Sequence, residues 1–444
     1  MFDLVKKFQY IITVGSCAKK KIGLEDQLTF FLELQSVQED QNMSRIVLRN
    51  ANLLDGENAM QPSSSVAIDG NKISEIGLGK TMALRSDDQV FDLQGQTLMP
   101  GLCIGHYHGA YRNYGAEGGS QEASGVEQAF MALNNIQIAL NCGYTNIISA
   151  GTHYNIDAEL VEAMEAGDLV GPRLIPCSKN FMPAPDESLR MDNEEICMAW
   201  GPDEFRAGAL KELERGAKII KIFASGGHGA GPSKGMKPEE IGAVVEVAKD
   251  YGARVRAHVT GKTKIMSCVN KGVEILDHAD GLDQKCMEEI VDKGCFVLPS
   301  MYVLLKCAEL EGNHFGFDTK LRAFDMMCEA LPKMISAGIK LVPGDDFGLW
   351  QIPHGTYAEE LICYRDHAGI QPLELIKWAT VYGGEMNGIE KLGRVRAGYL
   401  ADLLILNGDP SQDIAVLADS QAIQCVMKDG QFVSGNLSQS KVAA

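Results

Sequence analysis

The chain has 444 residues, of which 45% are hydrophobic and 23% are charged, and its formal net charge is −18 at pH 7. This length allows a large hydrophobic core and more than one domain. A strongly acidic chain lacks the basic surface that a phosphate backbone requires, so we expect no nucleic-acid partner.

The first 42 residues are polar and show one possible helix, at 24–37. The apolar stretch Phe8–Val14 weakly resembles a signal peptide, but it is short and is followed by three lysines at 19–21 instead of a cleavage site. No apolar run approaches the roughly 20 residues that cross a bilayer. We therefore expect no membrane partner, a cytoplasmic location, and a peripheral extension at residues 1–42.

The 12 cysteines are scattered, and no two of them form a Cys-x-x-Cys pair. Several, such as Cys103 and Cys425, lie inside apolar runs where a reduced and buried thiol is expected. This usage indicates a reducing compartment rather than a disulfide framework.

Both ends of the remaining chain have a β pattern. Short alternating segments fill residues 45–98, and Asp69-Gly70 is typical of a hairpin turn. The tail returns to this pattern with strands at 401–406 and 422–427. We therefore expect a small discontinuous β-sandwich domain built from residues 43–100 and 392–444.

Between these ends, eight short apolar strands alternate with helical patterns such as those at 126–140, 202–215, 238–251 and 319–337. The expected strands are 102–106, 145–149, 173–176, 219–224, 254–258, 274–278, 295–299 and 340–343. Eight such units predict an α/β fold, a (β/α)8 TIM barrel over residues 101–391. A doubly wound open sheet is the alternative, but no Gly-x-Gly-x-x-Gly follows the first strand.

The first barrel strand ends in two histidines. Alternate side chains of a strand point the same way, so His106 and His108 share one side while Tyr107 points to the other. Neutral imidazole is a common metal ligand, although His-x-His alone is a weak signal.

Further ligand-type residues fall where the later strands end. His258 ends strand five, His278 ends strand six, and Asp345 and Asp346 follow strand eight. Catalytic groups of a barrel gather at the carboxyl ends of its strands, so these residues are expected on one rim. Lys221 lies inside strand four among Ile and Phe, where a buried charge is costly.

Several segments carry a resemblance to a known family. They are Leu98-Met99-Pro100-Gly101-Leu102 before His106-x-His108, Lys221 to Gly227, Ala257-His258, Asp277-His278, Gly344-Asp345-Asp346, and Gly398 to Leu403. With these motifs, from about Arg45 to Val433, the chain resembles the metal-dependent amidohydrolase superfamily, in its imidazolonepropionase-like and prolidase-type branch.

The resemblance implies a set of ligands. His106 and His108 would bind one metal ion, His258 and His278 would bind a second, and Lys221, carboxylated on its amine, would bridge the two. The family pattern Gly-Thr-Asp reads Gly-Asp-Asp here, so Asp345 replaces the Thr and Asp346 takes the ligand position. Either carboxylate remains open as the ligand, and we favour Asp346.

The resemblance further implies a binuclear hydrolase that cleaves an amide, dipeptide, carbamate or urea C–N bond by attack of a metal-bridged hydroxide. Asp346 would serve as general base and then general acid. We expect two divalent metal ions, zinc first among the metals that these ligands suit. A lactonase or other ester hydrolase is the alternative, as is a mononuclear deaminase if Lys221 is not a ligand. A non-catalytic scaffold is disfavoured because every ligand position is filled.

Weaker candidates face the substrate. His228, in the Gly-rich loop after Lys221, is a candidate catalytic residue that would stabilise an oxyanion, with an ordinary loop histidine as the alternative. The candidate substrate-binding residues are Arg112, His153, Tyr154 and Tyr302. His354, after strand eight, would support the site from behind. We expect a small-molecule substrate and a homo-oligomer.

Overall fold

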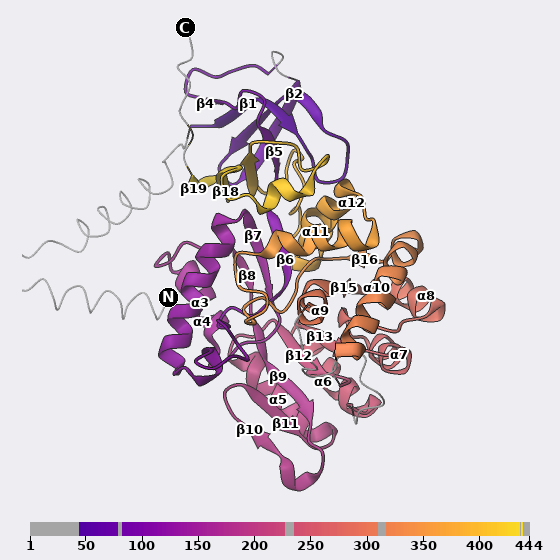
Figure 1. Cartoon of the computed structure of the whole chain (residues 1–444). Coiled ribbons are helices and arrows are strands. Elements are labelled where there is room, and N and C mark those ends of the chain that lie inside the picture. Colours follow the sequence, from indigo (N-terminus) through magenta and orange to yellow (C-terminus); the bar gives the residue numbers. More distant parts are fainter. Residues whose placement is uncertain (1–43, 79–81, 227–234, 310–316, 436, 438–444) are drawn as a thin grey trace, which may run out of the picture. The chain divides into compact units, whose positions relative to one another are not determined.

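The first sheet joins strands from both ends of the chain, shown as the indigo and yellow strands of Figure 1. The order is β19-β18-β17-β5-β1-β2-β3, and β4 also pairs with β1. β1 runs parallel to β4 along its first half and parallel to β5 along its second half, so the sheet forks there. The bounds are β1 (Ile46–Leu53), β2 (Gln61–Asp69), β3 (Lys72–Leu78), β4 (Gln89–Asp92), β5 (Thr97–Pro100), β17 (Leu403–Leu406), β18 (Ile423–Lys428) and β19 (Gln431–Gly435).

This computed structural model describes residues 44–78, 82–226, 235–309, 317–435 and 437. The helix expected at 24–37 therefore lies outside the described residues. Over the described ranges, the pairing of the terminal strands gives one forked sheet and not the two sheets of a sandwich. The division of the chain into domains at residues 100 and 391 stays a prediction.

All eight expected barrel strands are present. A three-stranded parallel sheet contains β6 (Leu102–Tyr107), β7 (Tyr144–Ser149) and β8 (Arg173–Ile175). An eight-stranded sheet contains β9 (Cys177–Pro183), β12 (Ile219–Phe223), β13 (Arg254–Val259), β14 (Ile275–His278), β15 (Phe296–Leu298) and β16 (Lys340–Leu341) in this order, with β11 (Ile196–Ala199) and β10 (Met191–Asp192) at the edge beyond β9.

The described strand pairs do not close into a ring, so the structure shows a mixed α/β fold and not the closed barrel that we predicted. One break falls at Pro176, between β8 and β9. The other lies between β16 and β6, where the N–H of Gly105 donates to the carbonyl oxygen of Pro343 at 2.8 Å. A proline cannot donate to a ladder, and β16 has only two residues, which explains why regular pairing stops at both places.

The strands of the three-stranded sheet and of the second eight-stranded sheet nevertheless pack around one shared interior. One apolar cluster takes residues from six of the parallel strands and the segment after β16: Cys103, Ile148, Cys177, Ile219, Ile275, Leu298 and Val342, with Met386 from α13 (Gly383–Asn387). We call it the inner cluster. A second and larger cluster packs the helices against the strands.

The helices begin and end where local chemistry predicts. Ser124 caps α3 (Gly125–Asn141) with a reciprocal bond to Glu127, and proline opens both α5 (Pro202–Glu214) and α6 (Pro238–Asp250). These three helices and α10 (Phe317–Ala337) confirm the predicted segments. The others near the strands are α4 (Ile156–Glu165), α7 (Lys262–Lys271), α8 (Gln284–Lys293), α9 (Met301–Ala308), α11 (Tyr357–Ala368) and α12 (Pro372–Lys377).

The segment from β9 to β11 was not predicted. Its first strand mixes Ser178, Lys179 and Asn180 with Phe181, so it lacks the apolar run by which the other strands were recognised. It returns toward the rim, because the N–H of Asn180 donates to the carbonyl oxygen of Glu195 at 3.1 Å. The insertion thus places Glu195 beside Asn180 of β9.

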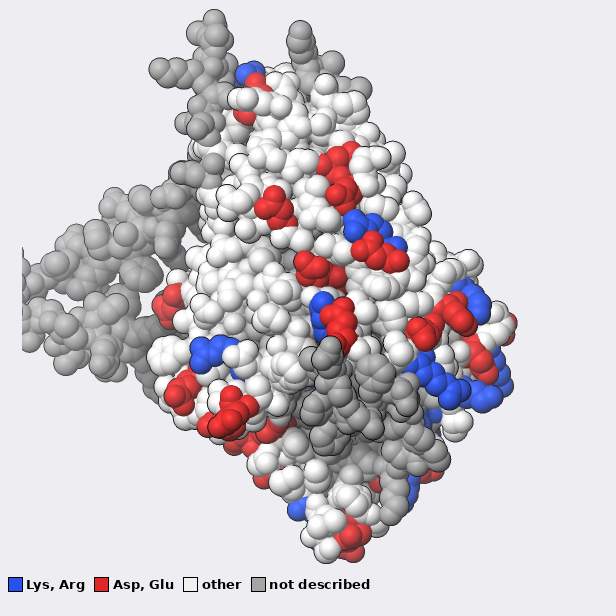
Figure 2. Space-filling view, viewed as in Figure 1, with Lys and Arg blue, Asp and Glu red and all other residues white. Residues whose placement is uncertain are grey.

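The surface is mixed in charge. On the face shown in Figure 2, acidic and basic side chains lie beside one another and form no extended basic surface. Within the described ranges, no helix combines the length and the apolar character needed to cross a membrane.

A buried ion pair joins the first sheet to the parallel strands. Arg173, at the start of β8, donates to the carboxylate of Asp402 from Nε at 2.7 Å and from Nη2 at 3.0 Å. Asp402 is 2% exposed and Asp429 is a further partner of Arg173. A two-pronged contact of this kind fixes the relative position of the two residues.

We expect Arg173→Met to lower the free energy of unfolding by about 3 kcal/mol, because it leaves a buried carboxylate without its partner. Urea unfolding followed by circular dichroism measures this change. Arg206→Met is the matched control, since Arg206 contacts Glu246 in an exposed pair and should shift the midpoint little. Equal shifts for the two variants would contradict this account of the Arg173 pair.

Candidate metal centre

The two histidines at the end of β6 face each other. His106 Nε2 lies 3.2 Å from His108 Nε2, and the two side chains are 1% and 6% exposed. Tyr107 points away and packs its ring 5.1 Å from the ring of His354. The strand alternation predicted from the sequence is therefore confirmed at this point.

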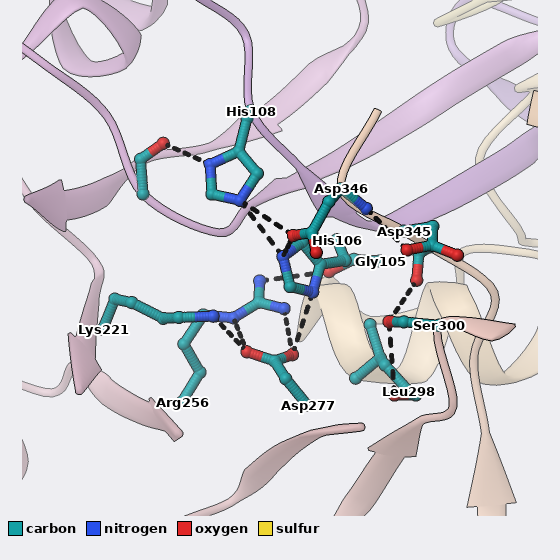
Figure 3. A network of polar contacts seen from close by, with 12 residues as sticks. Gly105, His106, His108, Lys221, Arg256, Asp277, Leu298, Ser300, Asp345 and Asp346 are labelled. Atoms are coloured by element: carbon teal, nitrogen blue, oxygen red, sulfur yellow. Dashed lines mark hydrogen bonds and ion pairs between the residues drawn. The ribbon is translucent and has the colours of Figure 1, made fainter. Parts of the chain in front are cut away.

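Asp346 completes a cluster of three ligand-type residues (Figure 3). Its Oδ1 atom lies 3.0 Å from His106 Nε2 and 3.4 Å from His108 Nε2. Donor atoms held about 2.1 Å from one tetrahedral ion would lie roughly 3.4 Å apart. The three separations and the nitrogen and oxygen donors therefore fit one divalent ion.

The neighbouring Asp345 has a different environment. It accepts hydrogen bonds from the backbone N–H groups of Val303 and Asp346, at 3.0 and 2.8 Å. Burial raises its pKa well above the usual range, and the nearby carboxylate of Glu360 raises it further. These contacts hold Asp345 against the start of α9, which favours Asp346 as the ligand.

The charge states suit metal binding. Burial lowers the pKa of His108 to about 4, so this imidazole is neutral near pH 7. Burial raises the pKa of Asp346, but His106 and His108 outweigh this effect and hold it well below the usual range. Metal ions bind neutral imidazole and ionised carboxylate, so both residues are in the required form.

The other two histidines adjoin this cluster. The rings of His258 and His278 are 4.5 Å apart, and the ring of His278 lies 5.7 Å from that of His106. His278 and Ala279 have positive φ angles of 70° and 55°, which non-glycine residues seldom adopt. Strained backbone of this kind persists where the surroundings fix a side chain, often at functional sites.

Lys221 is 2% exposed, and its amine donates to Asp277 Oδ2 at 2.6 Å. Burial lowers the pKa of this amine, and the charge of Asp277 acts in the opposite direction. Lys221 lies in the middle of β12, and its partner Asp277 lies 3.4 Å from His106, so the lysine adjoins the cluster from within the strands. The assignment of the six predicted residues as metal ligands remains a proposal.

Asp277 and Arg256 are site residues that the sequence analysis missed. Both are fully buried, and Arg256 donates to the carboxylate of Asp277 through Nε at 3.1 Å and Nη2 at 2.5 Å. The sequence does carry a signal for both, because each is a charged residue within an apolar strand, in Val-Arg-Ala-His and Ile-Leu-Asp-His. The cost of burying a charge could have indicated that each has a partner.

An aromatic column leads from the cluster toward the insertion. The ring of Tyr111 stacks on His108 at 4.3 Å and on Tyr114 at 4.1 Å. The Tyr114 hydroxyl donates to Glu195 Oε1 at 2.6 Å, and His153 Nε2 lies 3.4 Å from the same atom. Sequence reasoning found His153 but missed both Tyr114 and Glu195.

The remaining candidates lie at different depths. Arg112 and Tyr154 are exposed, and Tyr302 is buried on α9 with Lys306 Nζ 5.5 Å from its ring. His354 contacts the hydroxyl of Tyr357 at 3.0 Å, behind Tyr107. His228 lies outside the described residues. Among the four substrate candidates, His153 contacts the aromatic column, with its ring 5.7 Å from that of Tyr111.

Comparisons with known proteins found a matching family, related sequences and similar folds. The sequence profile of the amidohydrolase family matches residues 97–433. The ochratoxinase of Aspergillus niger is 32% identical over 249 residues, which cover 54% of this chain and 51% of that protein. The chain thus matches about half the length of this curated relative.

Two solved structures have similar folds. A Xaa-Pro dipeptidase with bound methionine in its active site aligns with a TM-score of 0.78 and 26% identity, covering 88% of this chain and 100% of that one. The A. niger ochratoxinase structure aligns with a TM-score of 0.78 and 24% identity, covering 88% and 96%. At 24% identity, the likeness to the ochratoxinase structure concerns the fold alone.

We expect His106→Asn to reduce bound metal by at least one ion per chain, because it removes a donor from the cluster. Elemental analysis of purified, metal-loaded protein measures this ratio. His367→Asn is the control, since His367 is exposed on α11 and packs its ring 5.2 Å from Phe324. An unchanged metal content in His106→Asn protein would reject the cluster as a metal site.

Proposed function

Because the chain belongs to the amidohydrolase family, we propose that it is a hydrolase that uses two divalent metal ions, zinc first among them, to cleave an amide-type C–N bond. The observation that carries this proposal is the convergence of His106, His108 and Asp346 on one point at the ends of the parallel strands. His258, His278 and Lys221 adjoin that point and would supply the second ion. In this proposal Lys221 is carboxylated.

We propose that the parallel strands act as a (β/α)8 barrel despite the two breaks in their pairing. The inner cluster supports this, because it draws one residue from most strands of both sheets into a common interior. The ligands then lie at the carboxyl ends of the strands, where barrel enzymes carry their active sites. Residues 43–100 and 392–444 would form the small domain beside it.

Divalent ions bound here would polarise a substrate carbonyl and lower the pKa of a water molecule. Asp346 is 26% exposed, so its carboxylate can contact that water and the substrate. We propose that Asp346 accepts a proton from the attacking water and passes it to the leaving nitrogen. The likeness to a Xaa-Pro dipeptidase favours a peptide-like substrate over an ester.

Metal removal tests this function. We expect a chelator to abolish hydrolysis of N-acyl amino acids and Xaa-Pro dipeptides, and zinc to restore it, because the C–N bond is not attacked by water unaided. Product release followed by chromatography measures both steps. Matched esters, lactones and amino-substituted heterocycles serve as the comparison panel. Turnover confined to esters would establish the lactonase alternative, and ammonia release from heterocycles would establish the deaminase.

Glu195 is expected to act on the substrate side. The contact with His153, 3.4 Å away, holds the pKa of Glu195 below its usual range, so the carboxylate is ionised and contacts both His153 and Tyr114. We expect Glu195→Gln to raise KM roughly tenfold, since a charged hydrogen bond is worth about 1.5 to 3 kcal/mol. Steady-state kinetics measures this, with Glu194→Gln as the control, because Glu194 contacts Arg215 at 3.3 Å. Equal kinetics in the two variants would remove Glu195 from the substrate site.

A further inference from the structure

One buried carboxylate contacts two of the proposed metal ligands. Asp277 Oδ2 accepts from the amine of Lys221 at 2.6 Å, and Asp277 Oδ1 lies 3.4 Å from His106 Nδ1 (Figure 3). His106 Nδ1 has no hydrogen-bond partner with good geometry, so this carboxylate is its nearest charged neighbour. Asp277 therefore connects one residue of the His106 cluster to the lysine.

Arg256 prevents this carboxylate from rotating. Its Nε donates to Oδ2 and its Nη2 donates to Oδ1, so both carboxylate oxygens are held. Its third nitrogen, Nη1, donates to the carbonyl oxygens of Gly105 at 3.1 Å and Ser149 at 2.7 Å. Gly105 precedes His106 and Ser149 ends β7, so Arg256 also fixes the backbone that carries the first histidine.

The placement of Arg256 is unusual for a barrel interior. The inner cluster receives Ile219 from β12 and Ile275 from β14, whereas β13, between them, contributes no member. Arg256 is fully buried and pairs in register with Ile275. A buried Arg with a bidentate carboxylate is often no more stable than an apolar pair of similar volume. Its presence here therefore calls for a role besides stability.

We propose that Asp277, held by Arg256, is the positioning residue that orients Lys221 and His106 for metal binding. This inference rests on the proposed function. Carboxylation of Lys221 forms a bond from the amine nitrogen to the carbon of CO2, moves one C=O electron pair onto oxygen, and releases one proton. The nitrogen keeps one hydrogen, which donates to Asp277 Oδ2. The new carboxylate then lies on the side of the nitrogen that faces away from Asp277.

The same carboxylate orients His106. With the hydrogen of this imidazole on Nδ1, toward Asp277, the lone pair lies on Nε2, which faces His108 and Asp346. A carboxylate behind a metal-binding histidine fixes its tautomer, and its loss typically weakens metal binding 10- to 100-fold. One residue would thus prepare a ligand for each part of the site.

The test uses full-length protein equilibrated with ¹³C-bicarbonate and zinc. We expect wild type to show a lysine carbamate signal by ¹³C NMR and about two zinc ions per chain. Asp277→Asn should lose most of the carbamate signal and bind zinc roughly 10- to 100-fold more weakly. Asp277→Asn/Arg256→Met is the second variant, because it removes both charges and avoids an unpaired buried guanidinium; it should show the same losses while remaining folded.

Asp402→Asn is the matched control. It alters another buried Arg-carboxylate pair, with Arg173, at the start of β8 and not at the strand ends that carry the ligands. It should lower the unfolding midpoint yet keep the carbamate signal and both zinc ions. This separates positioning from a purely structural effect.

Two results would overturn the inference in different ways. A carbamate signal and zinc affinity that are unchanged in folded Asp277→Asn protein would reject the role of Asp277 and leave the proposed function intact. A wild type with no carbamate signal, and with one zinc ion that Lys221→Ala retains, would reject both the binuclear function and this inference. Lys221 would then be the partner of a structural ion pair with Asp277.

Discussion

The ion pair between Arg256 and Asp277 is the constraint on which the candidate site depends. It lies in the interior between the parallel strands, where neighbouring strands supply apolar residues. Arg256 contacts backbone of β6 and β7 as well as the side chain from β14, so one side chain on β13 ties four strands together. Leaving either charge unpaired in this interior would cost several kcal/mol. The pair therefore forms as a unit with the fold.

The site above this pair combines rigid and accessible parts. His106, His108 and Lys221 are buried and lie in or directly after strands, which would give candidate ligands the fixed geometry that metal binding needs. Asp346 is partly exposed, and the aromatic column of Tyr111 and Tyr114 extends from His108 toward Glu195. In the proposed function, the metal ligands are therefore carried at the strand ends, and substrate contacts would come from loops and from the inserted segment around β10 and β11.

Family membership and geometry bear on different parts of the conclusion. The match over residues 97–433 places the chain in the amidohydrolase family. The cluster of His106, His108 and Asp346 fits a divalent ion through its own distances and donor atoms. Neither identifies the substrate, because specificity depends on the side chains around the site; in the proposed function, Glu195 and its contacts with Tyr114 and His153 would be part of that surrounding.

The sequence by itself determined the strands, the main helices and the ligand-type residues at the strand ends. These features rest on local patterns: the periodicity of apolar residues, the positions of glycine and proline, and the spacing of His106 and His108. Such patterns can be recognised without knowing the fold. Tertiary structure alone decided which carboxylate faces the histidines, since Asp345 and Asp346 differ only in their distant partners. It also revealed the polar insertion at β9 to β11 and the pairing of Arg256 with Asp277, 21 residues apart. Such contacts form between different strands, and a single charged residue within an apolar segment does not indicate which residue will pair with it.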